Sequence, residues 1–206
     1  MEKNNLLIVV SAPSGAGKTT ICKKLIKTSS NLVFSISMTT RQQRNNEIDG
    51  CDYFFVSIAE FEKRIKKGEF IEWAKVYDDY YGTPKKYLED LLSSGMDVLL
   101  DIDVQGAMNI KKKYKDRAVL IFITPPFLED LKARLSNRMT DSEEEIEKRL
   151  SFAKGELKNI NKYDYCVVND DIGTTVGKLK SIITAEKSKV KRINKELLKK
   201  LEIEDD

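Results

Sequence analysis

A glycine-rich segment near the amino terminus has residue types and spacing that suit phosphate binding. Beginning at Ala12 it reads Ala-Pro-Ser-Gly-Ala-Gly-Lys-Thr, which fits the phosphate-binding loop pattern, or P-loop, with Ala12 where a glycine usually stands. Gly15 and Gly17 would let consecutive backbone N–H groups converge on phosphate oxygens at the start of a helix. Lys18 could reach the β- and γ-phosphates, and the Thr19 hydroxyl could ligate Mg²⁺. The segment therefore predicts binding of a nucleoside triphosphate.

Two alternatives remain open for this segment. A glycine-rich turn between a strand and a helix can be purely structural, although the complete pattern and its flanking elements favour phosphate binding. At Ala12 the cost of lacking a glycine depends on backbone geometry. A positive φ would cost about 1 kcal/mol or more, whereas a negative φ would cost little.

A second group of polar residues follows within residues 37–83. Arg41 and Arg44 could hold another phosphate as forked donors, and the hydroxyls of Tyr53 and Tyr81 would add neutral donors. Glu72 could accept the adjacent N1–H and N2–H₂ donors of guanine, whereas adenine would present an acceptor at N1. Taken one by one, such residues are more often surface charge or core aromatics, so composition alone favours a structural role.

The absence of histidine from the 206 residues narrows the chemistry that remains. It excludes a histidine general base, a Ser–His or Cys–His dyad and a histidine-liganded metal site. The cysteines, Cys22, Cys51 and Cys166, are far apart and odd in number. This pattern argues against a disulfide framework or a zinc site and favours a reducing, cytoplasmic compartment.

Composition and charge predict a soluble globular chain. Charged residues make up 33% and hydrophobic residues 41%, and the mean hydropathy is −0.42. The 36 basic and 33 acidic residues leave a net charge of +3 with the signs interspersed, so neither nucleic acid nor a membrane is expected as a partner. The apolar run at residues 6–10 is too short for a signal peptide or a membrane span. The charged end, residues 187–206, predicts a solvated amphipathic helix.

Apolar runs predict the strands that would position these residues, at 6–10, 97–101, 118–123 and 165–168. Helical patterns lie between the runs, which indicates an α/β fold with a parallel sheet. Residues 37–88 differ, because they are polar, rich in tyrosine and contain only short strand-like pieces. Within them, Ser57 and Glu60 form a capping box that predicts a short helix. Apolar residues at helical spacing predict two amphipathic helices over 128–157.

The ordered motifs together resemble one known family. They are Ser-Ala-Pro-Ser-Gly-Ala-Gly-Lys-Thr from Ser11, Ser-Met-Thr-Thr-Arg-Gln-Gln-Arg from Ser37, Asp-Gly-Cys-Asp-Tyr-Phe-Phe from Asp49, Glu-Phe-Ile-Glu-Trp-Ala from Glu69, Tyr-Tyr-Gly-Thr from Tyr80, Leu-Asp-Ile-Asp-Val-Gln-Gly from Leu100 and Asn-Asp-Asp from Asn169. In this order and spacing, over roughly residues 6 to 186, the chain resembles the guanylate kinases. Departures at Gln42-Gln43 and Asn45-Asn46 lie between the binding positions.

The resemblance implies an α/β fold of the P-loop nucleoside-monophosphate kinase type. Such a fold has a parallel five-stranded sheet flanked by helices, a small β-rich GMP-binding insertion and a helical lid. We therefore expect a P-loop core domain at residues 1–36, 89–128 and 152–206, a GMP-binding domain at 37–88 and a lid at 129–151.

The same resemblance implies which residues serve each site. The ATP site would comprise Ser11, Ala12, Pro13, Ser14, Gly15, Ala16, Gly17, Lys18, Thr19, Thr20 and Asn169. The GMP site would comprise Ser37, Arg41, Arg44, Tyr53, Glu72, Tyr81, Gly82, Thr83 and Asp103. Thr19 and Asp101 would hold Mg²⁺, partly through water. The catalytic residues would be Lys18, Arg41, Arg134, Arg138 and Arg149.

The implied activity is Mg²⁺-dependent transfer of the γ-phosphoryl group of ATP to GMP, and also to dGMP, by a monomer or homodimer. The GMP phosphate is largely ionised near neutral pH, so the reaction needs no strong base. Two alternatives stay open. A guanylate-kinase-like interaction module tends to lose P-loop and lid residues, yet Lys18 and Arg138 are present. A P-loop kinase for another small acceptor would not need the combination of Glu72 with Arg41 and Arg44.

Overall fold

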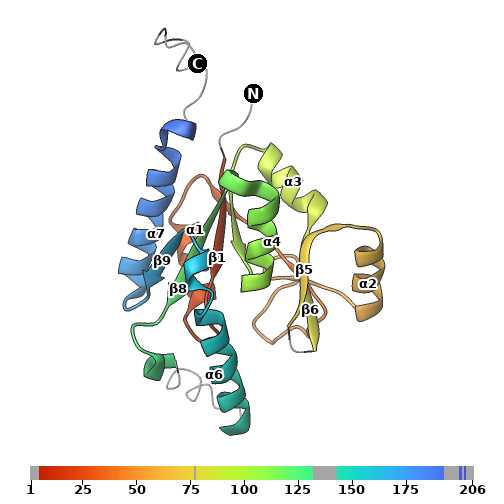
Figure 1. Ribbon diagram of the computed structural model, residues 1–206. Coiled ribbons are helices and arrows are strands. Elements are labelled where there is room, and N and C mark those ends of the chain that lie inside the picture. The colour runs from red at the N-terminus through yellow and green to blue at the C-terminus, as the bar shows by residue number, and fades with distance from the viewer. Residues whose placement is uncertain (1–4, 77, 132–142, 193–199, 201, 203–206) are drawn as a thin grey trace.

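The larger sheet of the protein consists of parallel strands. The computed structural model describes residues 5–76, 78–131, 143–192, 200 and 202, and in this part of the chain the sheet has five strands in the order β2-β7-β1-β8-β9 (Figure 1). The register places Val9 of the central strand beside Leu100 on one side and Leu120 on the other. The strands are β1 (Leu7–Ser11), β2 (Leu32–Phe34), β7 (Asp97–Asp101), β8 (Ala118–Thr124) and β9 (Tyr165–Val168). The parallel α/β sheet is confirmed, and so are the four strands predicted from apolar runs.

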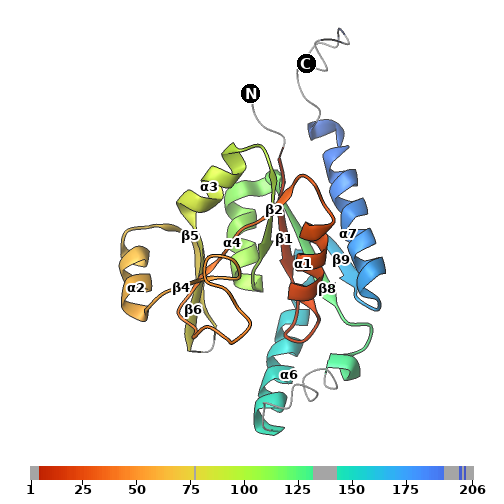
Figure 2. The same cartoon turned by 180° about the vertical axis from the view of Figure 1, so that it is seen from behind.

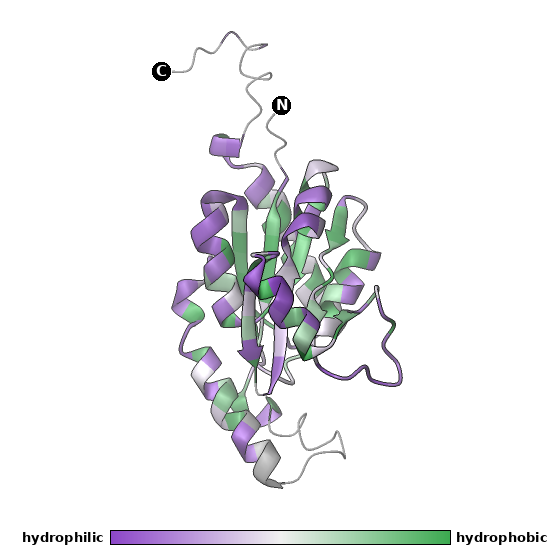
Figure 3. Ribbon diagram, turned by 90° about the vertical axis from the view of Figure 1, so that its right-hand side faces the viewer, coloured by the Kyte–Doolittle hydropathy of each residue, from purple (hydrophilic) through white to green (hydrophobic). Residues whose placement is uncertain are grey.

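Alternate residues of β1 point to opposite faces and enter two hydrophobic clusters. Ile8 and Val10 pack with α1 and α7 on one face, whereas Leu7 and Val9 pack with α3 and α4 on the other. Figures 1 and 2, which view opposite sides, show α4 over one face and α1 over the other. Figure 3 shows hydrophobic colour along the central strands and hydrophilic colour on the outer helices, as expected for a sheet covered on both faces. These helices are α1 (Lys18–Lys27), α3 (Lys85–Ser93), α4 (Val104–Tyr114) and α7 (Ile172–Lys187).

A smaller sheet lies beside the core. It is formed within residues 37–88, the polar segment that lacks the alternation of apolar strands and helices. Its strand order is β4-β3-β6-β5, with β6 antiparallel to both of its neighbours. Helix α2 (Ile58–Lys66) begins after Ser57, whose hydroxyl accepts the backbone N–H of Glu60 at 3.2 Å, so the predicted cap is confirmed. The strands are β3 (Met38–Thr39), β4 (Phe54–Phe55), β5 (Phe70–Val76) and β6 (Asp79–Pro84).

Two of the expected domain boundaries fall inside helices. Helix α3 runs through the boundary at 88/89, and α6 (Glu143–Leu157) runs through the boundary at 151/152. The division into three domains stays a prediction. Short 3₁₀ helices cover Lys115–Arg117, Ile160–Lys162 and Val190–Arg192. None of the helices in the described ranges has both the length and the apolar character needed to cross a membrane.

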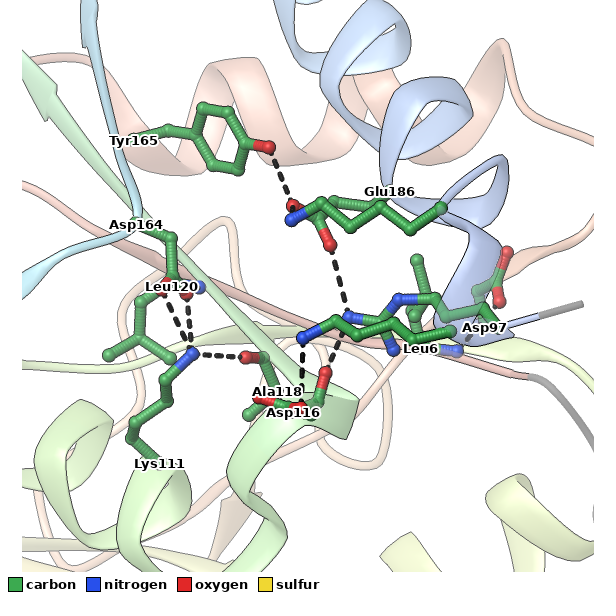
Figure 4. A network of polar contacts seen from close by, with 12 residues as sticks. Leu6, Asp97, Lys111, Asp116, Ala118, Leu120, Asp164, Tyr165 and Glu186 are labelled. Atoms are coloured by element: carbon green, nitrogen blue, oxygen red, sulfur yellow. Dashed lines mark hydrogen bonds and ion pairs between the residues drawn. The ribbon is translucent and has the colours of Figure 1, made fainter. Parts of the chain in front are cut away.

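The amino ends of the strands are joined to the end of α7 by a network of polar contacts (Figure 4). Glu186 is only 2% exposed and accepts hydrogen bonds from the Tyr165 hydroxyl and the Lys189 ammonium, both at 2.5 Å, and from Arg192 at 3.0 Å. Desolvation alone would raise the pKa of Glu186, but these three donors lower it overall. The carboxylate is therefore held in its charged form.

Two further carboxylates belong to this network. Asp97, also 2% exposed, accepts the backbone N–H of Leu6 at 2.9 Å and forms an ion pair with Lys187. Asp164 pairs with Lys111 at 2.7 Å. The expected solvated helix from residue 187 is thus corrected over the described residues up to 192. Helix α7 ends at Lys187, and a short 3₁₀ helix follows at Val190–Arg192. Lys189 and Arg192 donate to the buried carboxylate of Glu186, which needs counter-charges, while the side chain of Lys189 stays exposed to water.

Candidate active site

The P-loop connects the carboxyl end of β1 to the first residue of α1. Gly15 and Gly17 have φ values of +90° and +86°, in the left-handed region that favours glycine. Gly17 is the N-cap of α1, and no side chain caps the helix there, which leaves its first N–H groups available for an anion. Ala12 is not among the described non-glycine residues with positive φ, so its substitution for glycine costs little.

Lys18 and Asp101 meet where the P-loop faces the end of β7. The Lys18 ammonium lies 2.5 Å from Oδ1 of Asp101, and the Thr19 hydroxyl lies 3.5 Å from Oδ2 of the same carboxylate. Burial alone would lower the pKa of Lys18, but the adjacent Asp101 raises it overall. The lysine is therefore a permanent cation at the position where a P-loop lysine contacts phosphate.

One cavity of about 820 Å³ lies between the P-loop and the smaller sheet. Its wall combines both predicted nucleotide sites. The predicted residues that line it are Ala12, Pro13, Ser14, Gly15, Gly17, Lys18, Thr19, Thr20, Ser37, Arg44, Tyr53, Glu72, Tyr81, Gly82, Asp101 and Asp103. A volume in this range suits small-molecule ligands.

Other predicted residues lie behind the cavity wall. Ser11, Ala16, Thr83 and Asn169 are all at most 3% exposed. The Asn169 amide donates to the Ala16 carbonyl at 2.8 Å, and its oxygen accepts from the Thr175 hydroxyl at 3.0 Å. Asn169 thus stabilises the P-loop through a hydrogen bond to its backbone, and it does not line the cavity.

Arg41 is held by an acid to which the sequence reading gave no role. Its Nη2 donates to both oxygens of Glu47, at 2.7 and 3.0 Å, and the backbone N–H of Arg44 donates to the same carboxylate at 2.9 Å. The Arg41 guanidinium also lies 5.5 Å from the ring centroid of Tyr53. Arg44, in contrast, is exposed and lines the cavity. The close sequence spacing of the two arginines and Glu47 is the signal that could have found this pairing.

Glu72 is a buried carboxylate on β5. It is 6% exposed, and its Oε1 accepts the Thr83 hydroxyl from β6 at 2.5 Å. Burial, with a contribution from the negative charge of Asp103, raises the pKa of Glu72 to about 7. Asp103 itself caps α4 by accepting the backbone N–H of Gly106 at 2.7 Å. A carboxylate held at this cost, facing a cavity, is typical of a binding site.

The arginines expected on the lid cannot be placed. Arg134 and Arg138 lie outside the described residues. Arg149 lies within α6, but its side chain is outside what the structure describes. Their catalytic role therefore stays a prediction.

Helix α6 contributes cavity residues that the sequence reading missed. Phe152 and Glu156 line the cavity together with Asn159 and Lys162 from the following turns. Burial raises the pKa of Glu156, and its carboxylate also accepts the backbone N–H of Ser14 in the P-loop. The spacing of Phe152 and Glu156, four residues apart in a helix, could have signalled one face directed at the site.

A parallel sheet with a P-loop after its central strand, and an inserted sheet whose polar residues line the same cavity, define a kinase of the P-loop nucleoside-monophosphate type. The family model described as guanylate kinase matches residues 4–186. The chain belongs to the guanylate kinase family.

Individual relatives agree with this assignment. The chain is 52% identical over 201 residues to a guanylate kinase of Caldanaerobacter subterraneus subsp. tengcongensis, covering 98% of this chain and 97% of that protein. It is 48% identical over 202 residues to a guanylate kinase of Clostridioides difficile, covering 98% of each chain. The crystal structure of guanylate kinase from Anaplasma phagocytophilum superposes with a TM-score of 0.81 at 35% identity, covering 100% of this chain and 99% of that one.

Proposed function

We propose that this protein is an ATP:GMP phosphotransferase, which converts ATP and GMP to ADP and GDP. The observation that carries the proposal is that Lys18 of the P-loop and the buried Glu72 line the same cavity from different sheets. Family membership supports the same activity. Neither an interaction module nor a kinase for another acceptor is favoured, since the relatives are named guanylate kinases and the similarity extends over nearly their whole length.

On the donor side, the P-loop would hold the phosphates of ATP. The free N–H groups at the start of α1 and the Lys18 ammonium provide positive potential for the β- and γ-phosphates. Asp101 is the partner of Lys18 in the structure, so ATP binding would exchange one anionic neighbour of the lysine for another. Asn169 would contribute by holding the P-loop backbone in its conformation through the hydrogen bond to the Ala16 carbonyl.

On the acceptor side, Arg44, Tyr53 and Tyr81 line the cavity where the GMP phosphate would lie. Arg41, oriented by Glu47, would add a second guanidinium. Burial raises the pKa of Tyr53 to about 12, so its hydroxyl stays a hydrogen-bond donor at neutral pH.

Glu72 would select the base. Ionised, it would accept two hydrogen bonds from guanine N1–H and N2–H₂, while the Thr83 hydroxyl donates a further hydrogen bond to Oε1. Adenine would place an acceptor against the carboxylate and leave a buried charge unpaired, which is a strong source of discrimination.

The transfer itself forms a bond between a GMP phosphate oxygen and the γ-phosphorus of ATP and breaks the bond to the β–γ bridging oxygen, which leaves with ADP. The attacking oxygen arrives ionised, because a phosphate monoester has a second pKa of about 6. No general base is required, which suits a chain without histidine. Arg134, Arg138 and Arg149 would neutralise charge on the transferring group.

The donor set at the end of β7 fits Mg²⁺. Thr19 and Asp101 offer a hydroxyl and a carboxylate, both hard oxygen ligands, 3.5 Å apart. The described residues hold no group of three or more potential acidic, cysteine or histidine ligands, as expected for an ion that keeps waters and nucleotide oxygens in its shell. When bound, Mg²⁺ would neutralise charge on the β- and γ-phosphates. Use of dGMP, a cytoplasmic location and a monomeric or homodimeric state remain predictions.

A coupled ADP-release assay with GMP, dGMP, AMP, CMP and UMP as acceptors tests the proposal. We expect rapid turnover with GMP, measurable turnover with dGMP and little with the others. Equal kcat/KM for GMP and AMP would overturn the assignment of the acceptor. Omitting Mg²⁺ should abolish turnover while leaving thermal unfolding unchanged.

A further inference from the structure

Gly106, in the first turn of α4, lies directly beside the carboxylate of Glu72. A Cβ atom built on Gly106 would lie 2.6 Å from Oε2 and 3.1 Å from Cδ of Glu72. Real Cβ atoms essentially never show contacts under 3.0 Å, so the two groups could not occupy these positions together. Glu72 belongs to the inserted sheet and Gly106 to the core, so the contact joins the two parts of the site.

Backbone conformation does not explain the glycine. Gly106 lies inside a helix and is not among the glycines with positive φ. Alanine would be the better helix former at such a position, so glycine here weakens α4. The missing side chain is therefore needed for space.

We propose that Gly106 is a specificity-determining position of the guanine pocket, because only a residue without a side chain lets the Glu72 carboxylate stand where it can accept both guanine donors. The proposal rests on the function proposed above for Glu72. It assigns Gly106 a positioning role that acts through Glu72, without contact to the substrate.

The surroundings of Glu72 explain why it could not simply move aside. Its Oε1 is fixed by the buried Thr83 hydroxyl at 2.5 Å, so the carboxylate cannot turn without losing that bond. On the α4 side, the Cβ atom would also lie 3.2 Å from Oδ1 of Asp103, the other acid whose charge acts on Glu72. A methyl group at Gly106 would thus displace the guanine-binding oxygens, while the helix itself would tolerate it.

A matched pair of glycine-to-alanine variants tests this role. Gly106→Ala introduces the contact with Glu72. Gly173→Ala in the first turn of α7 introduces the same 3.2 Å contact with an N-cap aspartate oxygen, here of Asp171, with no glutamate nearby. We expect Gly106→Ala to raise the KM for GMP and lower the GMP-over-AMP ratio of kcat/KM about ten-fold or more, with the KM for ATP unchanged. Gly173→Ala should change each value less than two-fold.

Combination with Glu72→Gln shows whether Gly106 acts through Glu72. If it does, Gly106→Ala should lower the GMP-over-AMP ratio in the parent protein but not further in the Glu72→Gln protein. An unchanged ratio in Gly106→Ala, or full additivity with Glu72→Gln, would overturn the proposal. A parent protein without preference for GMP would instead refute the proposed function, so the two failures are distinguishable.

A folding defect would not leave the question open. If Gly106→Ala does not fold, the double variant Gly106→Ala with Glu72→Asp retracts the carboxylate by one methylene. Recovery of cooperative thermal unfolding in the double variant supports the proposed contact. A double variant that remains unfolded overturns it.

Discussion

Charged side chains play opposite roles at the two ends of the parallel strands. We call the end where the strands begin the amino edge of the sheet and the end where they finish, next to the cavity, the carboxyl edge. At the amino edge, Glu186 and Asp97 are buried and each has protein donors that satisfy it. Beside the carboxyl edge, Glu72 of the smaller sheet is nearly as buried, yet its donors come from the uncharged Thr83 and its pKa is raised to about 7. The first arrangement stabilises the fold. The second leaves carboxylate oxygens that can still accept hydrogen bonds from a ligand.

The contrast also appears in the direction of the two pKa shifts. Protein donors lower the pKa of Glu186 against the effect of burial, so its charge is stabilised by folding. Burial dominates at Glu72 and disfavours its charge until a ligand supplies donors. Binding sites are commonly held in such a destabilised state, whereas structural sites are not.

The largest effect is expected from Lys18→Met at the carboxyl edge. Removing the ammonium that would bind the transferred phosphate should lower kcat by about 10³-fold or more, or about 4 kcal/mol of transition-state stabilisation. The protein should still unfold cooperatively, with a loss of about 2–4 kcal/mol in unfolding free energy, because Asp101, whose side chain is 10% exposed, loses its counter-charge. Steady-state kinetics and urea unfolding measure the two quantities. Activity within ten-fold of the parent would remove Lys18 from the catalytic site.

The next effect is expected from Glu186→Gln at the amino edge. It would leave the Arg192 guanidinium, whose side chain is 9% exposed, without its counter-charge, at a cost of about 2–4 kcal/mol in unfolding free energy. The kcat and both KM values should stay within two-fold of the parent, since this edge lies away from the cavity.

The pH dependence of stability provides a second readout for Glu186. Its folded-state pKa is lowered, so its contribution is complete above the unfolded value of about 4.5 and is lost as the pH falls below it. The difference in urea midpoint between the parent and Glu186→Gln should therefore shrink on acidification. A constant difference from pH 7 to pH 4 would contradict the ion-pair explanation.

Glu72→Gln, beside the carboxyl edge, should have the opposite effects: the protein should become more stable and less selective for guanine. The neutral amide keeps an oxygen for the Thr83 hydroxyl but removes the buried charge, so we expect a stability gain of about 1–2 kcal/mol at pH 8. Guanine selectivity should fall, because the amide cannot accept from both donors of the base.

The sign of this gain follows from the raised pKa. The parent protein loses stability as the pH rises from about 4.5 through about 7, and the variant does not. The gain should therefore vanish near pH 4.5. Thermal unfolding at pH 5 and pH 8 tests it, and a variant less stable than the parent at pH 8 would show that Glu72 is a structural group like Glu186.

The smallest effect is expected from Lys191→Ala, also at the amino edge. Its ion pair with Asp116 measures 2.8 Å, but both side chains are more than half exposed. Such exposed pairs contribute little, so the urea midpoint should not change measurably. A loss comparable to that of Glu186→Gln would mean that burial is not what makes the amino edge stabilising.

Much of the fold and of the site could be predicted from the sequence because the relevant signals are local. The apolar runs of β1, β7, β8 and β9, the cap at Ser57 and the P-loop turn each depend on a few consecutive residues. The residues proposed for the acceptor site were identified through the ordered motifs, because residues 37–83 alone gave no decisive pattern. The short edge strand β2 gave no periodic signal of its own.

The contacts that could not be predicted join residues distant in sequence. Glu186 was not recognised as a buried ion-pair centre, because its partners include Tyr165 and the residues after α7, where charge alone indicated a solvated helix. Glu156 belongs to α6, far along the chain from the P-loop, yet its carboxylate accepts a backbone N–H of that loop. The nearness of Gly106 to Glu72 depends on how α4 packs against β5.

The sequence by itself determined which groups this protein can present to nucleotides: a P-loop, paired arginines, the Glu72 carboxylate and no histidine. Only the tertiary structure decided which carboxylates are paired and which are left for a ligand. Burial and partner geometry set the pKa of each acid, and both arise from the packing of segments that are far apart along the chain. That is why Glu72 and Glu186, the same residue type with similar burial, have pKa values shifted in opposite directions, and why we expect the first to serve binding and the second to serve stability.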